Sequence, residues 1–123
     1  MSTWHGATLA AATAHEEVQV LTSRRDGTLR RPRTIWIVAV GDRAFVRSKN
    51  GRDAAWFRGA VATGNGRLIV GGRGYDVTFR EADRQDLPTV DAGYRAKYGR
   101  YASIVEHLVG AGPRAATLEL QAA

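Results

Sequence analysis

Six consecutive apolar residues, Ile35-Trp36-Ile37-Val38-Ala39-Val40, lie between two turn-forming segments in the first half of the chain. An extended run of this kind is apolar on both faces, which is typical of a strand buried on both sides. Asp26-Gly27 before the run and Gly41-Asp42 after it favour tight turns between antiparallel strands. We therefore expect a strand from about Leu29 to Val40, central in its sheet and joined to its neighbours by hairpins.

Short apolar or alternating segments elsewhere predict further strands. Val18, Val20 and Thr22 fall on one face of a strand over Glu16–Thr22, and alternation also predicts a half-buried strand over Tyr75–Arg80. The remaining expected strands are Arg43–Ser48, Arg67–Val70 and Ala116–Leu120. Together these segments predict a mainly β protein with helices: a six-stranded antiparallel barrel, which leaves few exposed strand edges.

Three segments have helical character. Thr8–Ala14 is rich in alanine, so residues 1–15 are expected to form a partly helical N-terminal extension of a single domain spanning residues 1–123. Asp53 is placed to cap a short helix that runs through Val61. A long late helix is expected from about Thr89 or Asp91 to Gly110, because its apolar residues recur every three or four positions. Its tyrosines, Tyr94, Tyr98 and Tyr101, form a stripe suited to core or dimer packing.

The charge balance favours anionic partners. The net charge is +6 and 16 of the 18 basic residues are arginine, but they are spread along the chain instead of forming a basic tail, which makes nucleic acid a weaker expectation. Five arginines surround the first hairpin, and they form either a solvated face or a secondary contact for an anion such as a polyglutamate cofactor tail or nucleic acid; they are Arg24, Arg25, Arg30, Arg31 and Arg33.

Several classes of site are disfavoured by the residues present. The chain has no cysteine, so disulfides, thiolate catalysis and cysteine-ligated metals are excluded. His5, His15 and His107 show no metal-ligand spacing, so no metal site is expected. Neither a membrane-spanning run nor a secretion signal is recognisable, and we expect a cytoplasmic protein.

The densest group of candidate binding residues begins at the end of the third expected strand. Within Val46–Phe57, read as V-R-S-K-N-G-R-D-A-A-W-F, six consecutive residues offer cations, a hydroxyl, an amide and a glycine: Arg47, Ser48, Lys49, Asn50, Gly51 and Arg52. Gly51 can adopt a positive φ that closes the backbone around an oxyanion, and the cations can donate to phosphate. The alternative is a solvated Asn-Gly turn followed by a core tryptophan, Trp56.

The segments T-I-W-I-V-A-V and V-R-S-K-N-G-R-D-A-A-W-F, in this order of strands, resemble the split β-barrel flavin- and deazaflavin-binding proteins. This superfamily includes pyridoxamine phosphate oxidases and deazaflavin-dependent nitroreductases. Within it the chain looks closest to a small family of uncharacterised bacterial proteins, to which K-Y-G in the late helix and the terminal A-T-L-E-L also belong. The similarity covers roughly residues 18–120.

The resemblance implies a cofactor site and an assembly. By the S-K-x-G match, Ser48, Lys49 and Gly51 would hold the phosphate of FMN or a deazaflavin, with Arg47, Asn50 and Arg52 beside them and Trp56 near the cofactor. Residues 34–37 match the strand on which the cofactor ring lies, which makes Thr34, Ile35 and Trp36 candidate cofactor contacts, and Thr34 or a backbone N–H would donate to that ring. Members of the superfamily are commonly homodimers with the cofactor at the interface, so a homodimer is implied.

Three functions remain open on these grounds. The first is a flavin- or deazaflavin-binding oxidoreductase that transfers a hydride to a small acceptor, with the redox chemistry supplied by the cofactor. The second is a non-catalytic split barrel that binds a ligand or partner. The third is nucleic-acid binding through the arginines of the first hairpin, for which affinity would fall steeply with salt.

Overall fold

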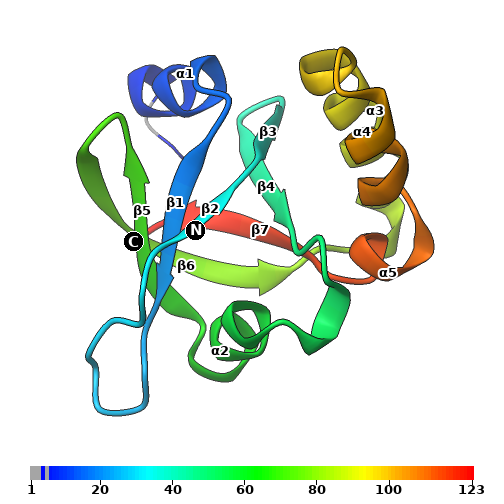
Figure 1. Ribbon diagram of the computed structural model, residues 1–123. Coiled ribbons are helices and arrows are strands. Elements are labelled where there is room, and N and C mark those ends of the chain that lie inside the picture. Colours follow the sequence, from blue (N-terminus) through cyan, green and yellow to red (C-terminus); the bar gives the residue numbers. More distant parts are fainter. Residues whose placement is uncertain (1–3, 5) are drawn as a thin grey trace.

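The computed structural model describes Trp4 and residues 6–123, and within this part seven strands and five α-helices follow one another (Figure 1). The strands are β1 (Val18–Thr22), β2 (Arg33–Ile35), β3 (Ile37–Val40), β4 (Arg43–Arg47), β5 (Asn65–Val70), β6 (Arg73–Glu81) and β7 (Thr117–Ala122). The helices are α1 (Gly6–Ala14), α2 (Ala55–Thr63), α3 (Leu87–Tyr98), α4 (Ala102–Leu108) and α5 (Ala111–Arg114), with single 3₁₀ turns η1 (Gly51–Asp53) and η2 (Arg84–Asp86).

The strands form one antiparallel sheet in the order β2-β1-β5-β6-β7-β4-β3. The two end strands, β2 and β3, are consecutive in the chain and separated by Trp36 alone. Because the two ends of the sheet are therefore joined at Trp36, the sheet curls into a nearly closed barrel. The expected barrel with helices is confirmed, with seven strands where six were predicted.

The additional strand arises because the predicted Leu29–Val40 strand is interrupted. Val18 pairs with Ile35, whereas Ile37 pairs with Val46, so the chain changes partners at Trp36. Residues 29–32 lie outside β2, apart from an isolated bridge between Leu29 and Ser23. The position of the apolar run also differs from the prediction, because β3 lies at an end of the sheet order and not at its centre.

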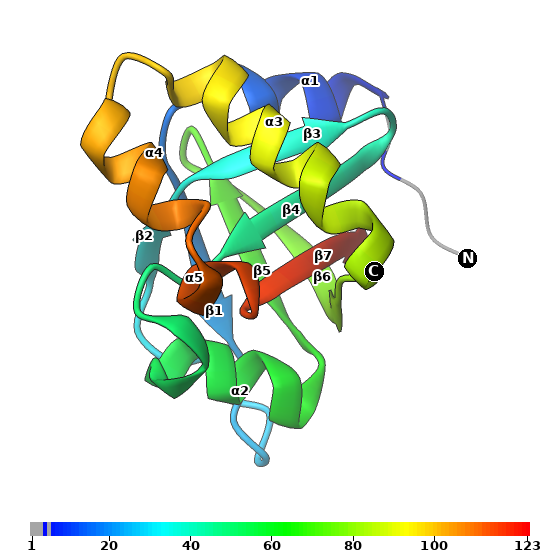
Figure 2. The same ribbon diagram turned by 90° about the vertical axis from the view of Figure 1, so that its right-hand side faces the viewer.

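Burial on both faces of β3 is nevertheless correct, and it has a different cause. Ile37 points into the barrel core, while Val38 belongs to a second cluster with Val90, Tyr94 and Tyr98. Helix α3 packs on β3 and supplies this second layer, as Figure 2 shows. The strand is therefore apolar on both sides because it separates the barrel interior from a helix.

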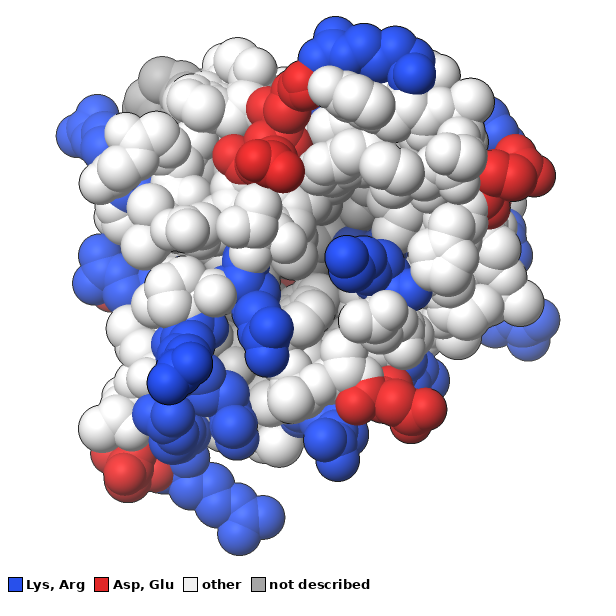
Figure 3. Space-filling view, viewed as in Figure 1, with Lys and Arg blue, Asp and Glu red and all other residues white. Residues whose placement is uncertain are grey.

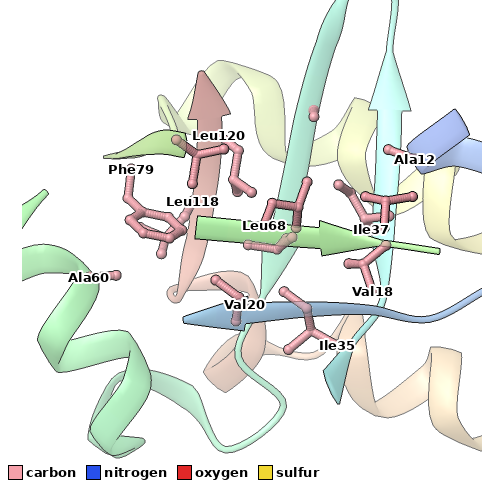
Figure 4. Close-up of a cluster of buried hydrophobic side chains, with 14 of the residues drawn as sticks. Ala12, Val18, Val20, Ile35, Ile37, Ala60, Leu68, Phe79, Leu118 and Leu120 are labelled. Carbon is pink, nitrogen blue, oxygen red and sulfur yellow. The ribbon is translucent and has the colours of Figure 1, made fainter. Parts of the chain in front are cut away.

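The barrel core combines residues from all parts of the sheet. Val18 and Val20 of β1 are buried with Thr22, as the alternation predicts. They meet Leu68, Leu118 and other apolar side chains inside the barrel (Figure 4). Trp4 is buried with this cluster, and its indole Nε1–H donates to the carbonyl of Leu120 at 2.7 Å.

The late helical region is divided where one long helix was predicted. Helix α3 ends at Tyr98 and α4 begins at Ala102. Gly99 is a poor helix former, and the two residues after it bond to a different part of the chain. Arg100 and Tyr101 both bond the carboxylate of Glu16, which precedes β1. A second break at Gly110 separates α4 from α5.

The start of the midway helix also differs from the prediction. Asp53 lies in the 3₁₀ turn η1, and the cap of α2 is Ala54, which supplies no side-chain hydrogen bond. The helix then runs to Thr63, two residues beyond the expected Val61, and Gly64 ends it with φ of 75°. This left-handed conformation carries a steric cost for residues with a Cβ and little for glycine.

Among the residues that the structure describes, no helix has the length and apolar character needed to cross a membrane.

Candidate functional site

A cavity of about 410 Å³ opens between the β2 strand and the loop that joins β4 to α2. Its volume lies in the range of small-molecule sites. The part of its wall that comes from β2 and the following corner is made by Arg33, Thr34, Ile35 and Trp36. The opposite part is made by four consecutive residues, Arg47, Ser48, Lys49 and Asn50. Figure 3, viewed from the same side as Figure 1, shows a hollow near the centre of the molecule.

The structure thus brings together the two sequence segments from which a cofactor site was predicted. Eight of the ten predicted site residues line the cavity, namely Thr34, Ile35, Trp36, Arg47, Ser48, Lys49, Asn50 and Trp56, whereas Gly51 and Arg52 do not. The β3–β4 hairpin pairs Ile37 with Val46, so the residues just before β3 and just after β4 come together at the open end of this hairpin.

Arg47 lines the cavity, but its guanidinium is fully buried and bonded to the protein. It donates to Asp91 at 2.5 Å, to Thr117 Oγ1 at 2.8 Å and to the carbonyl of Leu108 at 3.1 Å. Asp91 also accepts from Arg114 at 2.9 Å. Arg47 therefore joins β4 to β7, α3 and α4, and these bonds use most of the donors that a ligand would need.

Arg52 lies on the other side of the loop, where it meets a carboxylate of β6. Its Nη1 donates to Glu81 at 2.5 Å and to the carbonyl of Ala115 at 2.9 Å. The Arg52 guanidinium holds the pKa of the Glu81 carboxyl below its usual range. Both side chains are about half exposed, so the pair is of the surface type that adds little stability.

The loop between these two arginines is a tight backbone turn. The N–H of Gly51 donates to the carbonyl of Ser48 at 3.0 Å, and Gly51 has φ of 73°. The turn leaves Lys49 and Asn50 exposed, while Ser48 remains buried. His107 of α4 fixes the turn from outside, since its Nε2–H donates to the carbonyl of Lys49 at 2.6 Å.

Ser48 carries the clearest sign of a missing partner. Its side chain is buried and lines the cavity, yet its Oγ has no hydrogen-bond partner. Buried hydroxyls are normally bonded, because an unpaired one keeps the full cost of leaving water. Rotation of the Ser48 side chain toward the cavity would let a ligand oxygen beside Lys49 provide that partner, so the residues present fit the phosphate of a flavin-type group.

The rest of the wall is largely apolar and aromatic. Trp56 of α2 and Ile104 and Leu108 of α4 contribute apolar surface, with Ile104 47% exposed. Trp36 lies stacked on Tyr98, with ring centroids 4.0 Å apart and planes 4° apart. Such a surface suits a flat ring system.

The Trp36 corner is held in place by α3 through its backbone. The Tyr94 hydroxyl donates to the carbonyl of Trp36 at 3.3 Å, and Tyr98 accepts from the N–H of Ile37 at 3.2 Å. Lys97 donates to the carbonyl of Ile37 at 2.8 Å, and burial lowers the pKa of Lys97 to about 8. These bonds satisfy the groups that lose their strand partners at the corner, so the predicted tyrosine stripe packs against the site wall.

Several residues of the site were not predicted from the sequence. Glu17 and Arg33 line the cavity, and so do Ile104 and Leu108. Arg33 had been assigned to the arginine-rich face around the first hairpin, and Glu17 carries no motif. None of these residues, nor His107, has a local pattern that distinguishes it, because their position depends on the packing of distant segments.

The histidines provide no metal centre in the described part of the chain, where no group of three His, Asp or Glu side chains could hold an ion. His5 lies outside the described residues. His15 Nδ1 donates to the carbonyl of Ala11 at 2.8 Å, and His107 bonds the Lys49 carbonyl.

Comparison with known proteins places most of the chain in one family. A family model described as "Uncharacterized protein conserved in bacteria (DUF2255)" matches residues 8–120. The chain matches no curated protein.

Solved structures with the same fold are distant in sequence. A conserved hypothetical protein from Mycobacterium tuberculosis has a TM-score of 0.68 at 7% identity, over 99% of this chain and 81% of that one. An F420-H2 dependent reductase has a TM-score of 0.65 at 16% identity, over 87% of this chain and 95% of that one. A putative pyridoxamine 5'-phosphate oxidase from Listeria innocua has a TM-score of 0.61 at 10% identity, over 95% and 90%. At these identities the likeness shows the fold alone.

Proposed function

The chain belongs to the bacterial family DUF2255, and from this premise we propose that its cavity binds a flavin-type cofactor, FMN or a deazaflavin, for hydride transfer to a small acceptor. One observation carries the proposal: the unpaired, buried hydroxyl of Ser48 beside the exposed amine of Lys49 on one wall, facing the β2 edge on the other. The reductase and oxidase folds that resemble the chain agree with this choice of cofactor class.

The phosphate would lie at the Ser48–Asn50 turn. Ser48 Oγ donates one hydrogen bond there, and Lys49 supplies a positive charge that forms no ion pair within the described residues. Gly51 gives the turn its shape, whereas Arg47 and Arg52 act from behind it by fixing its two ends to Asp91 and Glu81.

The ring system would lie along Thr34, Ile35 and Trp36, against the apolar wall of Trp56 and Leu108. When bound, the cofactor supplies the hydride chemistry. The chain orients the ring, excludes water on its apolar side and offers the exposed Thr34 side chain as a donor to the ring edge. Glu17 also lines the cavity, and its carboxylate would accept from a ring N–H of the bound cofactor.

A second copy of the chain would complete this site. Ile104 and Tyr101 remain exposed on α4 and at its start, although both are large and apolar or aromatic. Burial of these side chains in a homodimer would close the open side of the cavity. Light scattering of the purified protein tests this part, and a monomeric mass at micromolar concentration contradicts it.

The decisive test is a titration of the protein with FMN and, separately, with a deazaflavin, followed by fluorescence and by thermal unfolding. A ligand that binds the native state raises its stability by about 2.7 kcal/mol at a hundredfold excess over the dissociation constant. We expect a shift with one of the two cofactors and its loss in Lys49→Gln.

The matched control is Arg73→Gln, which removes the same charge from an exposed position at the start of β6. It should leave cofactor binding unchanged. Absence of a shift with both cofactors would overturn the proposal and favour a split barrel that binds another ligand or a protein partner.

A further inference from the structure

Many arginines of this protein are paired with carboxylates, as in Arg43 with Asp86, Arg47 with Asp91 and Arg100 with Glu16. Other arginines form no ion pair with described residues. Three of these, Arg25, Arg30 and Arg58, lie around one hollow, and their side chains form no hydrogen bond with other described residues. Unpaired guanidinium groups that gather in this way repel one another, and an anion between them would relieve that repulsion.

The hollow has a volume of about 320 Å³ and lies between the first hairpin and α2, apart from the cavity described above. Arg25 and Arg30 approach from the hairpin, and Arg58 approaches from the helix. On the side of α2, its lining follows one helix face, namely Ala55, Arg58, Gly59, Ala62 and Thr63. In Figure 3, basic side chains gather at the lower left, over the hairpin loop seen in Figure 1.

Two polar atoms converge on the space beside Gly59. A Cβ at Gly59 would lie 2.9 Å from Thr22 Oγ1 and 3.0 Å from Arg30 Nε. The Thr22 side chain is 1% exposed, and its Oγ1 has no hydrogen-bond partner. A Cβ at this position would therefore collide with both side chains, so glycine allows the Arg30 side chain of the hairpin to pack closely against α2.

The groups beside the hollow do not neutralise its positive charge. The carboxylate of Asp26, next to Arg25, accepts from the N–H and hydroxyl of Thr28 and is not part of the lining. Helix α2 begins at Ala55, on the edge of the hollow, and no side chain caps its first N–H groups. These groups carry the partial positive charge of a helix N-terminus.

We propose that this hollow, formed by Arg25, Arg30 and Arg58 over Gly59, is a second binding site that takes the phosphate group of a small phosphorylated ligand. Arginine guanidinium groups match phosphate oxygens in geometry and charge. The small volume between one hairpin and one helix face suits a single phosphate group better than an extended polymer backbone. The site is separate from the cofactor cavity and does not depend on the function proposed for that cavity.

The test is a titration of the full chain with inorganic phosphate at constant ionic strength, followed by the backbone amide NMR signals. We expect the amide signals of Ala55, Arg58 and Gly59 to shift and saturate together. Arg30→Gln and Arg58→Gln should each weaken binding about tenfold, as expected for loss of a hydrogen bond between charged groups.

Gly59→Ala tests the geometry without changing the charge. Its methyl group would lie 3.0 Å from Arg30 Nε and would push that side chain aside, so phosphate binding should weaken at least as much as in Arg30→Gln, while the thermal unfolding curve reports whether the fold is intact. Arg73→Gln is the charge-matched control and should bind phosphate like the wild type. Lys49→Gln should also retain binding at the hollow, which separates this proposal from the cofactor site.

Two results would overturn the proposal. One is a loss of affinity in Arg73→Gln as large as in Arg30→Gln, which would indicate attraction by net charge alone. The other is binding of a short single-stranded oligonucleotide that is weakened equally by substitution of Arg24, Arg31 or Arg33, because that would indicate an extended nucleic-acid surface.

Discussion

The base and the tip of the β4–α2 loop use their cations in opposite ways. At the base, Arg47 is fully buried and donates to one carboxylate, one hydroxyl and main-chain carbonyls. At the tip, two residues later, Lys49 is exposed beside the cavity, its backbone carbonyl accepts from His107, and its amine forms no ion pair with the part of the chain that the structure describes. The difference teaches that proximity in a cationic motif does not give residues a common role, because a buried charge requires protein partners and an exposed one remains available.

The largest expected effect concerns the base of the loop. Asp91→Ala leaves Arg47 buried without its carboxylate, and removal of one partner of a buried ion pair costs about 3–5 kcal/mol. Urea unfolding should show this loss in the free energy of unfolding. A loss below about 1 kcal/mol would mean that the ion pair at the base of the loop stabilises the protein no more than a surface ion pair does. The proposed difference between the base and the tip would then be wrong.

At the tip we expect the reverse. Lys49→Gln should weaken binding of the cofactor at least tenfold, by about 1.5–3 kcal/mol, since it removes a charge-assisted hydrogen bond to phosphate. Its free energy of unfolding should change by less than about 0.5 kcal/mol, as for other exposed substitutions. Fluorescence titration and urea unfolding of the same preparation measure both quantities, and a large loss of stability would contradict the assignment.

A second buried carboxylate, that of Glu119, makes the stability of the protein depend on pH. Glu119 accepts from Arg43 at 2.9 Å and from Arg80 at 2.7 Å, and these guanidinium groups, Arg43 foremost, hold its pKa below the ordinary value of 4.5. A lowered pKa in the folded state gives stability that is present above the ordinary pKa and is lost as pH falls through the folded one.

Glu119→Gln should therefore lower the stability of the protein at pH 7 by about 1–3 kcal/mol, because hydrogen bonds to charged groups are lost. The difference from the wild type should shrink as the pH falls below 4.5. Thermal unfolding between pH 3 and 7 measures it, and a pH-independent difference would show that the charge of Glu119 is not responsible.

The smallest effect on stability is expected for Ser48→Ala. The substitution removes a buried hydroxyl that makes no hydrogen bond, so the free energy of unfolding should stay within about 0.5 kcal/mol of the wild type or rise. Cofactor affinity should nevertheless fall, since the proposed partner of that hydroxyl is the phosphate. Unchanged affinity for both cofactors would remove Ser48 from the site.

Much of the fold was predictable because local patterns and tertiary structure agree. The burial of Val18, Val20 and Thr22 follows from alternation, and the β3–β4 hairpin follows from Gly41-Asp42. The largest differences from the predicted elements lie at two interruptions, Trp36 and Gly99, where continuous patterns gave one element and the structure has two. At both points the chain begins to contact a different strand or segment. The periodicity of apolar residues does not show which segments will contact one another.

The parts of the candidate site that consist of consecutive residues were predictable from the sequence. Residues 47–52 were identified as a group from their side-chain chemistry, and residues 34–36 from the resemblance to split barrels. Glu17, Arg33 and His107 could not be assigned to the site in this way, since Glu17 comes there through the pairing of β1 with β2, Arg33 carries no motif that separates it from the other arginines of the hairpin, and His107 comes from α4.

The strand-forming segments, the cationic loop and the positive charge follow directly from the amino-acid sequence, because these depend on side chains close together in the chain. Which cations are bonded within the protein depends instead on how the chain folds. Arg47 meets Asp91 and Arg52 meets Glu81 across separations of 44 and 29 residues, while Lys49 and Arg30 face a cavity and a hollow instead. The physical reason is that the role of a charge depends on what lies within a few ångströms of it, and in this barrel those neighbours come from distant strands and helices.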